Sequence, residues 1–176
     1  THSTHLLSYT TLSLEIADLD DDGDQDFLTG GISNLQWQEN IGNNLFHSHT
    51  LTQNFDECHA VKVIDIDADG DKDIIASSFT TDQIVWFEND GNQNFTQTVL
   101  SNAADGNVGF DIIDFDVDGD YDIVASAYNS DEVFWLQNNG SQVFTKNTIK
   151  TNFNGAASLK VFDFDNDGDK DVVTAG

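Results

Sequence analysis

The stretch DFDNDGDKDVV, residues 163–173, places five aspartates around one glycine within nine positions and then becomes apolar. The same word occurs as DLDDDGDQDFL from Asp18, DIDADGDKDII from Asp65 and DFDVDGDYDIV from Asp114. The four copies begin 47, 49 and 49 residues apart, so the chain contains an internal repeat. A repeat of this length constrains the fold more strongly than any single predicted strand does.

A second word keeps the same interval. It reads WQENIGNNLF from Trp37, WFENDGNQNF from Trp86 and WLQNNGSQVF from Trp135, with steps of 49 and 49. In the first unit the tryptophan follows its aspartate loop two residues earlier than in the others, which accounts for the shorter first step of 47. Two different words with one period indicate structural units that are built alike.

Each unit predicts four short strands. In the second unit they are AVKVIDI, DIIASS, QIVWFEN and NFTQTVL, which are rich in β-branched and aromatic residues. Asp90-Gly91 and Asn139-Gly140 are hairpin-turn pairs, because glycine adopts positive φ without steric cost. Four antiparallel strands repeated at about 40–50 residues predict an all-β fold, a β-propeller of four-stranded antiparallel blades. A stacked β-solenoid is the rival, but its coils are shorter and lack internal hairpins.

The phase of the repeat predicts a single propeller region, 1–176, with about three and a half blades. The last strand of a preceding blade, three full blades and a partial blade are expected at residues 1–7, 8–51, 52–100, 101–149 and 150–176. Propellers close with about 4–8 blades, so we expect an incomplete ring. Either the ring continues in a longer chain, or a second copy completes it.

The net charge of −26 argues against polyanionic partners. All six basic side chains are lysine, and so acidic a chain repels nucleic acid, anionic lipid and acidic polysaccharide. Twenty of the 32 acidic side chains occupy the odd positions of the four loops, so the charge marks sites. No apolar run reaches 18 residues, and membrane insertion is not expected. The sequence opens with neither a signal-peptide pattern nor a methionine, so we expect a processed mature protein or an excised fragment.

The aspartate loops have the chemistry of calcium sites. Carboxylates at positions 1, 3 and 5 can point at one centre when glycine at position 6 allows a sharp turn, and calcium takes about 6–8 oxygen ligands. In an EF-hand the cage closes with glutamate at position 12, but position 12 here is Thr29, Ala76, Ala125 or Thr174. The closing acid is therefore position 9, just before a strand. Magnesium tolerates such a flexible cage of carboxylates poorly.

The pattern D-x-D-x-D-G-D-x-D between two strands resembles the FG-GAP or VCBS repeat of integrin α-chain propellers and many secreted bacterial proteins. The W-x-x-N-x-G word is more similar to the bacterial members, and the resemblance covers essentially the whole chain. It implies four Ca²⁺ ions, side-chain ligands at positions 1, 3, 5 and 9, and a backbone carbonyl ligand at position 7. The ligands implied here are Asp18, Asp20, Asp22, Asp24, Asp26, Asp65, Asp67, Asp69, Asp71, Asp73, Asp114, Asp116, Asp118, Asp120, Asp122, Asp163, Asp165, Asp167, Asp169 and Asp171.

The repeated aromatic and apolar positions have a structural interpretation. Trp37, Trp86 and Trp135 could stack on sugar rings, but their regular recurrence favours packing between blades. Position 2 of each loop is also expected to pack; its residues are Leu19, Ile66, Phe115 and Phe164. Binding sites in repeat proteins tend to lie where the repeats differ, so irregular positions are better candidates.

The histidines are irregular. His47 and His49 share one face of a predicted strand, and His2 and His5 take the related place at the start of the chain. A zinc or copper site needs further ligands, which the sequence does not identify. Solvated strand histidines are therefore the favoured interpretation.

The first strand of each unit carries two further features. Charged residues of alternating sign precede its end, namely Glu15, Lys62, Asp111 and Lys160. If this strand is innermost, these charges either pair between blades or are hydrated by channel water. Cys58 is expected to be a buried thiol, and a single cysteine forms no intrachain disulfide.

These features favour an extracellular or cell-surface module of a secreted bacterial protein. We expect it to be a non-catalytic, calcium-binding recognition or adhesion scaffold with a protein or neutral glycan partner. One alternative is a self-assembling subunit whose neighbours complete the ring, as a homo-oligomer. Another is part of a polysaccharide-acting enzyme, but the chain has no arginine clamp, nucleophile elbow or phosphate loop. The ligand itself is not readable from a scaffold repeat.

Overall fold

The computed structural model describes residues 10–53 and 55–176, and this part of the chain forms fourteen β-strands. Blade 1 contains β1 (Thr11–Ala17), β2 (Asp26–Gly31), β3 (Leu35–Asn40) and β4 (Phe46–Thr52). Blade 2 contains β5 (Cys58–Ile64), β6 (Asp73–Ser78), β7 (Gln83–Asn89) and β8 (Phe95–Ser101). Blade 3 contains β9 (Asn107–Ile113), β10 (Asp122–Ala127), β11 (Glu132–Asn138) and β12 (Phe144–Lys150). Blade 4 contains β13 (Ser158–Phe162) and β14 (Asp171–Ala175).

Each of the first three blades is a four-stranded antiparallel sheet whose strands lie in chain order, and blade 4 is a two-stranded sheet. The prediction of an all-β fold with four-stranded antiparallel blades is confirmed. The predicted strand at residues 1–7 lies outside the described residues. Within the ranges 10–53 and 55–176, no helix has the length and apolar character of a membrane span.

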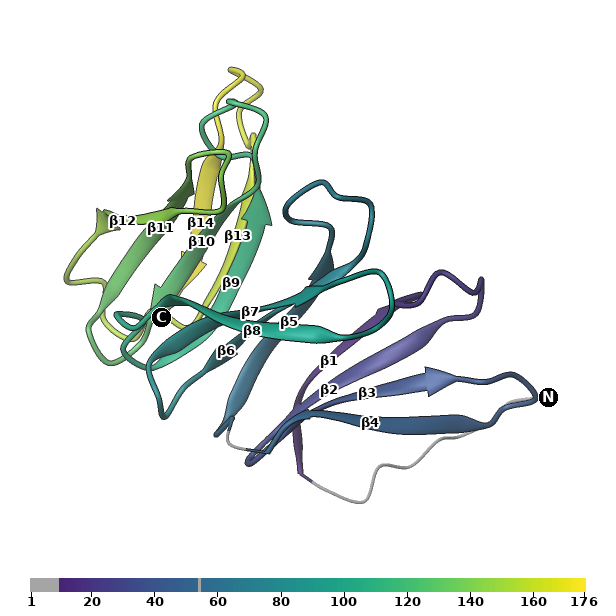
Figure 1. The fold of residues 1–176 in the computed structure, drawn as a ribbon. Coiled ribbons are helices and arrows are strands. Elements are labelled where there is room, and N and C mark those ends of the chain that lie inside the picture. The colour runs from purple at the N-terminus through teal and green to yellow at the C-terminus, as the bar shows by residue number, and fades with distance from the viewer. Residues whose placement is uncertain (1–9, 54) are drawn as a thin grey trace.

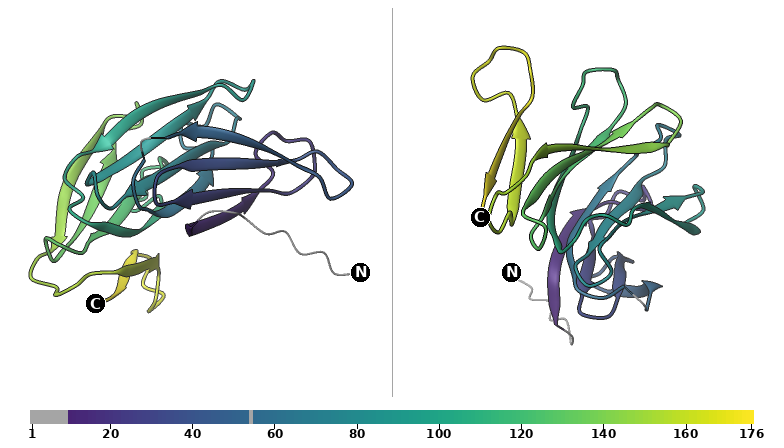
Figure 2. Two further views of the ribbon diagram at one scale, coloured as in Figure 1. Left: turned by 90° about the horizontal axis from the view of Figure 1, so that it is seen from below. Right: turned by 90° about the vertical axis from the view of Figure 1, so that its left-hand side faces the viewer.

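The blades stand side by side in chain order (Figure 1). Their first strands are neighbours along the inner side of the arc, because β5 contacts both β1 and β9, and β9 contacts β13. Figure 2 shows blades 1 and 4 at the two ends of this arc. The aspartate loops each join a first strand to a second strand, so they all lie at one end of the blades.

The apolar core lies between consecutive blades. All six residues of β6 and all six of β10 are buried, because these strands have a neighbouring blade on each face. One cluster joins blades 1 and 2, a second joins blades 2 and 3, and a third joins blades 3 and 4. Trp37 and Trp86 are buried in the first two clusters and Trp135 packs against the third, which confirms a packing role for the tryptophans.

The prediction for position 2 of the aspartate loops holds in three blades and is wrong in the fourth. Leu19 and Ile66 are buried, and Phe115 packs against the cluster between blades 3 and 4. Phe164 is 68% exposed and contacts Phe162 edge-on. Position 2 packs toward the following blade, and the described chain places no blade beyond blade 4.

Blade 1, at the other end of the arc, also exposes an apolar side chain. Leu14 in β1 is 56% exposed, whereas the residues at the same place in later blades, Val61, Phe110 and Leu159, are at most 5% exposed. Those residues pack against a preceding blade. Both ends of the arc therefore present apolar side chains that interior blades bury.

Charged residues of the inner strands pair between blades. Lys62 Nζ lies 3.1 Å from Glu15 Oε2, and Lys160 Nζ lies 3.1 Å from Asp111 Oδ1. Each pair joins two consecutive blades, so of the two alternatives the structure favours pairing over hydration alone.

Candidate metal centres

The four aspartate loops share one backbone conformation. The glycines at position 6 all have φ near +100°, namely Gly23, Gly70, Gly119 and Gly168. This region disfavours residues with a Cβ atom, which explains why position 6 is glycine in every copy. The N–H of each glycine donates to the position 1 carboxylate at 3.0–3.1 Å. The position 7 N–H donates to the position 5 carboxylate at 2.8–3.0 Å.

Position 9 anchors each loop to its sheet. Asp26, Asp73 and Asp122 are at most 1% exposed. In all four loops one oxygen of this carboxylate accepts the backbone N–H of position 2, at 2.9–3.3 Å. In blades 1 to 3 the other oxygen accepts the backbone N–H of the asparagine that ends the third strand, at 2.7–2.8 Å. In blades 1 to 3, position 9 thus fixes the loop and two strands at once.

The predicted ligands converge in part. Carboxylate oxygens lie within 4.8 Å of one another for positions 1, 3 and 9 in the second, third and fourth loops, and for positions 1, 3 and 5 in the first. The side chains at position 7 belong to none of these groups. They are Asp24, Asp71, Asp120 and Asp169. The family resemblance implies that position 7 binds the ion through its backbone carbonyl. The clusters of side-chain oxygens do not test this ligand, which stays a prediction.

The electrostatics of the loops fit a bound cation. Burial raises the pKa of Asp73 from its ordinary value of 3.8 to about 6. Burial also raises the pKa values of Asp20, Asp67 and Asp122, and neighbouring loop carboxylates raise them further. One oxygen of Asp18 is buried with no hydrogen-bond partner. A cation favours the charged form of each carboxylate and supplies the missing contact. The donors are all oxygen, which suits a hard ion such as Ca²⁺.

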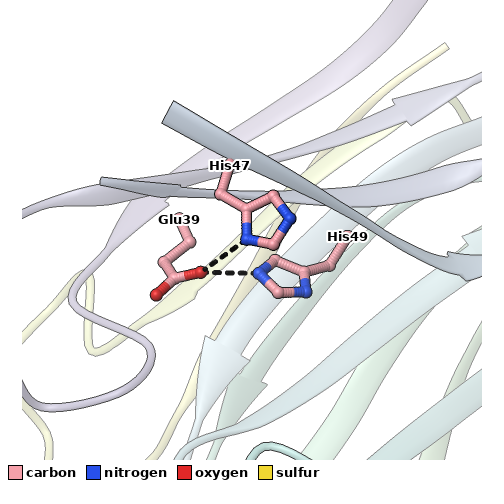
Figure 3. Close-up of side chains that lie close together, drawn as sticks. All are labelled: Glu39, His47 and His49. Atoms are coloured by element: carbon pink, nitrogen blue, oxygen red, sulfur yellow. Dashed lines mark hydrogen bonds and ion pairs between the residues drawn. The ribbon is translucent and has the colours of Figure 1, made fainter. Parts of the chain in front are cut away.

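A second kind of cluster lies on the outer hairpin of blade 1. Glu39 of β3 and His47 and His49 of β4 place three ligand atoms within 4.8 Å of one another (Figure 3). Sequence reasoning singled out the two histidines but missed Glu39. The available signal was the hairpin itself, because pairing of the tryptophan word with the strand that follows it sets Glu39 opposite His47.

An open cleft of about 540 Å³ lies between blades 1 and 2. Its lining comes from β3, β4, the β7–β8 turn and the start of β8, and consists of Trp37, His49, Thr50, Leu51, Asn92, Gln93, Asn94 and Phe95. Amide and hydroxyl groups therefore stand beside aromatic rings. Trp37 is only 2% exposed, and its indole N–H donates to Asp26 at 3.0 Å, so it forms a wall rather than a free platform.

The remaining candidate, Cys58, is a buried thiol, as predicted. Its Sγ lies 3.5 Å from the Ser13 hydroxyl on blade 1. Burial raises the pKa of this thiol to about 11, which disfavours the nucleophilic thiolate.

Comparisons with known proteins agree with this geometry. A family model described as an FG-GAP-like repeat matches residues 18–76, 65–125 and 114–174, so each match runs from one aspartate loop past the next. The comparison with curated proteins gave no match. Among solved structures, the chain is similar to one from a study of specific recognition of non-reducing terminal N-acetylglucosamine by an Agrocybe aegerita lectin. The TM-score is 0.62 at 22% sequence identity, over 94% of this chain and 47% of that one. The chain thus spans about half the length of that lectin chain.

Proposed function

Because the chain belongs to the FG-GAP-like repeat family, we propose that it is an extracellular calcium-loaded propeller module that binds a neutral glycan without converting it. The observation that carries the calcium part is the repeated loop. Each of the four loops brings oxygens of three carboxylates within 4.8 Å of one another, and a backbone N–H of the loop holds the position 1 carboxylate. Such like charges are stable together when a cation compensates them.

The calcium has a structural role in this proposal. Position 9 ties each loop to the second strand and, in blades 1 to 3, to the end of the third. An ion bound by the loop therefore stabilises the edge of the blade and takes no part in a reaction. Extracellular modules bind calcium with dissociation constants of about 10⁻⁴–10⁻³ M, which suits a secreted protein.

The cleft between blades 1 and 2 is the proposed ligand site. It offers the side chains of Thr50, Asn92 and Gln93 together with the ring of Phe95, and sugars are bound by such mixtures of polar groups and aromatic faces. The net charge of −26 disfavours acidic sugars, so a neutral glycan fits better. The lectin of similar fold supports a glycan over a protein partner, although the likeness extends to the fold alone.

Native mass spectrometry of the calcium-loaded chain tests the first part of the proposal. We expect four ions on each chain. Absence of bound calcium would overturn the assignment of the loops, whatever the state of assembly.

Calorimetric titration with neutral oligosaccharides, including ones that end in N-acetylglucosamine, tests the second part. Gln93→Ala is expected to weaken binding. Its matched control is Gln142→Ala, which alters the same place in the hairpin of blade 3 and shares its positive φ. Equal affinity in both variants would remove the cleft from the proposal.

Self-assembly is the second candidate function, because the ends of the arc expose Leu14 and Phe164. Side chains at these places are covered between interior blades. A mass series that grows with protein concentration supports assembly, and Leu14→Ser is expected to suppress it. A monomer at all concentrations would count against this candidate.

A further inference from the structure

We propose that Glu39, His47 and His49 form a binding site for a borderline divalent transition metal such as Zn²⁺, separate from the aspartate loops. The three residues come from one hairpin. Glu39 of β3 is the cross-strand partner of His47 of β4. Side chains two residues apart on a strand share a face, so His49 lies on the same face as His47.

The side chains already point at one another (Figure 3). His49 Nε2 donates to Glu39 Oε2 at 2.6 Å, and His47 Nδ1 lies 3.4 Å from the same oxygen. Ligands of a tetrahedral zinc ion at about 2.0–2.2 Å stand about 3.3 Å apart. Small side-chain shifts therefore convert this arrangement into one that surrounds an ion.

Packing restricts one of the two imidazoles. The His49 ring stacks on the buried Trp37 ring, with centroids 4.4 Å apart and planes 19° apart. His49 is the cross-strand partner of Trp37, so the same register that builds the blade orients this ligand. A ligand held in place loses less conformational entropy on binding.

The donor set selects the class of metal. Two imidazole nitrogens and one carboxylate oxygen suit Zn²⁺ and Cu²⁺, whereas the oxygen-only loops suit Ca²⁺. The His47 side chain is 64% exposed, so an ion can enter from solution. Three protein ligands leave a coordination position for water or for a donor atom of a ligand in the adjoining cleft, which His49 also lines.

The other blades show that the hairpin does not need the histidines. In blade 2, Glu88 stands opposite Thr96, and Trp86 stands opposite Thr98. In blade 3 the corresponding partners are Gln137 with Thr145, and Trp135 with Asn147. The repeated scaffold is thus kept while the pair of imidazoles occurs in blade 1 alone among the described blades, as expected of a site rather than a packing element.

The test is a calorimetric titration of Zn²⁺ into the full chain in saturating Ca²⁺, so that the loops are filled. We expect one zinc site. The double variant His47→Thr/His49→Thr copies the hairpin of blade 2 and is expected to weaken zinc binding about tenfold or more. Glu39→Gln weakens it as well, while Glu88→Gln, the matched change in blade 2, leaves it unaltered.

A converse variant keeps the test informative if the first double variant fails to fold. Thr96→His/Thr98→His places one imidazole opposite Glu88 and a second opposite Trp86, as in blade 1, and is expected to raise the zinc count from one to two. In wild type, the imidazole NMR signals of His47 and His49 shift with zinc and those of His59 do not. Zinc binding of undiminished affinity in His47→Thr/His49→Thr, or no zinc binding by wild type, overturns the proposal and leaves a hydrogen-bonded cluster only.

Discussion

Asp73 Oδ1 accepts the backbone N–H of Asn89 at 2.8 Å, so a predicted calcium ligand also holds the end of the third strand of its blade. Its other oxygen accepts the N–H of Ile66. The same arrangement recurs at Asp26 and Asp122. In blades 1 to 3, one carboxylate therefore couples the predicted calcium site to the shape of the blade.

The second loop offers a paired test of its ligands. Asp69→Asn removes a carboxylate at position 5 and is expected to lower calcium affinity there about tenfold or more. Asp71→Asn keeps the backbone carbonyl at position 7 and is expected to retain the ion. Native mass spectra give the ion count of both variants, and loss of an ion in Asp71→Asn would instead assign its side chain as a ligand.

Removal of calcium should lower stability. When the free calcium concentration is a hundred times the dissociation constant of a loop, binding to that loop stabilises the folded chain by about 2.7 kcal/mol. The contributions of the four loops add. Thermal unfolding with and without a chelator measures it. A melting temperature that does not respond to the chelator would contradict a structural role for the ion.

The stability of the calcium-free chain should depend on pH through the protonation of Asp73. Its pKa in the folded state is raised to about 6, so the stability it contributes is fully present below its ordinary value of 3.8. That contribution is lost as pH rises through about 6. Carboxyl NMR titration reports this pKa directly, and added calcium is expected to lower it because the cation favours the charged form.

Gly30 marks a close approach between blades 1 and 2. A Cβ atom there would collide with the Cys58 thiol and the Ser13 hydroxyl. Gly30→Ala is expected to destabilise the chain by about 1–3 kcal/mol in denaturant unfolding. Cys58→Ala in the same chain is expected to recover part of that loss, and strictly additive effects would show that the two residues do not meet.

The ion pair of Lys62 and Glu15 joins the inner strands of blades 1 and 2 at 3.1 Å. Both side chains are partly exposed, so a double-mutant cycle with Lys62→Gln and Glu15→Gln is expected to give a coupling of less than about 1 kcal/mol. High salt is expected to reduce it further. A coupling insensitive to salt would point to packing rather than charge.

The blades and the aspartate loops were predictable because the sequence that forms each of them is repeated several times along the chain. The spacing of the loops and of Trp37, Trp86 and Trp135 gives the number and order of strands, since one period repeats through both words. The glycine at position 6 and the acid at position 9 follow from what a cage of carboxylates needs.

Other features depend on neighbours that spacing does not reveal. Glu39 joins His47 through the register across a hairpin, which turn geometry sets rather than composition. Phe164 is exposed because position 2 packs toward the next blade along the chain, and the described residues place none beside blade 4. The asparagine that ends the third strand binds the loop through its backbone N–H and its side-chain amide, but the sequence alone does not show that the recurrent Asn of the tryptophan word reaches the aspartate loop.

The main contacts between sheets join consecutive blades, so each blade is stabilised mainly by its neighbours along the chain. In such an arrangement the terminal blades, which have one neighbour each, unfold locally more readily than the interior blades. Amide hydrogens of β14 should therefore exchange with solvent early, while those of β6 and β10, buried along their whole length, should exchange last.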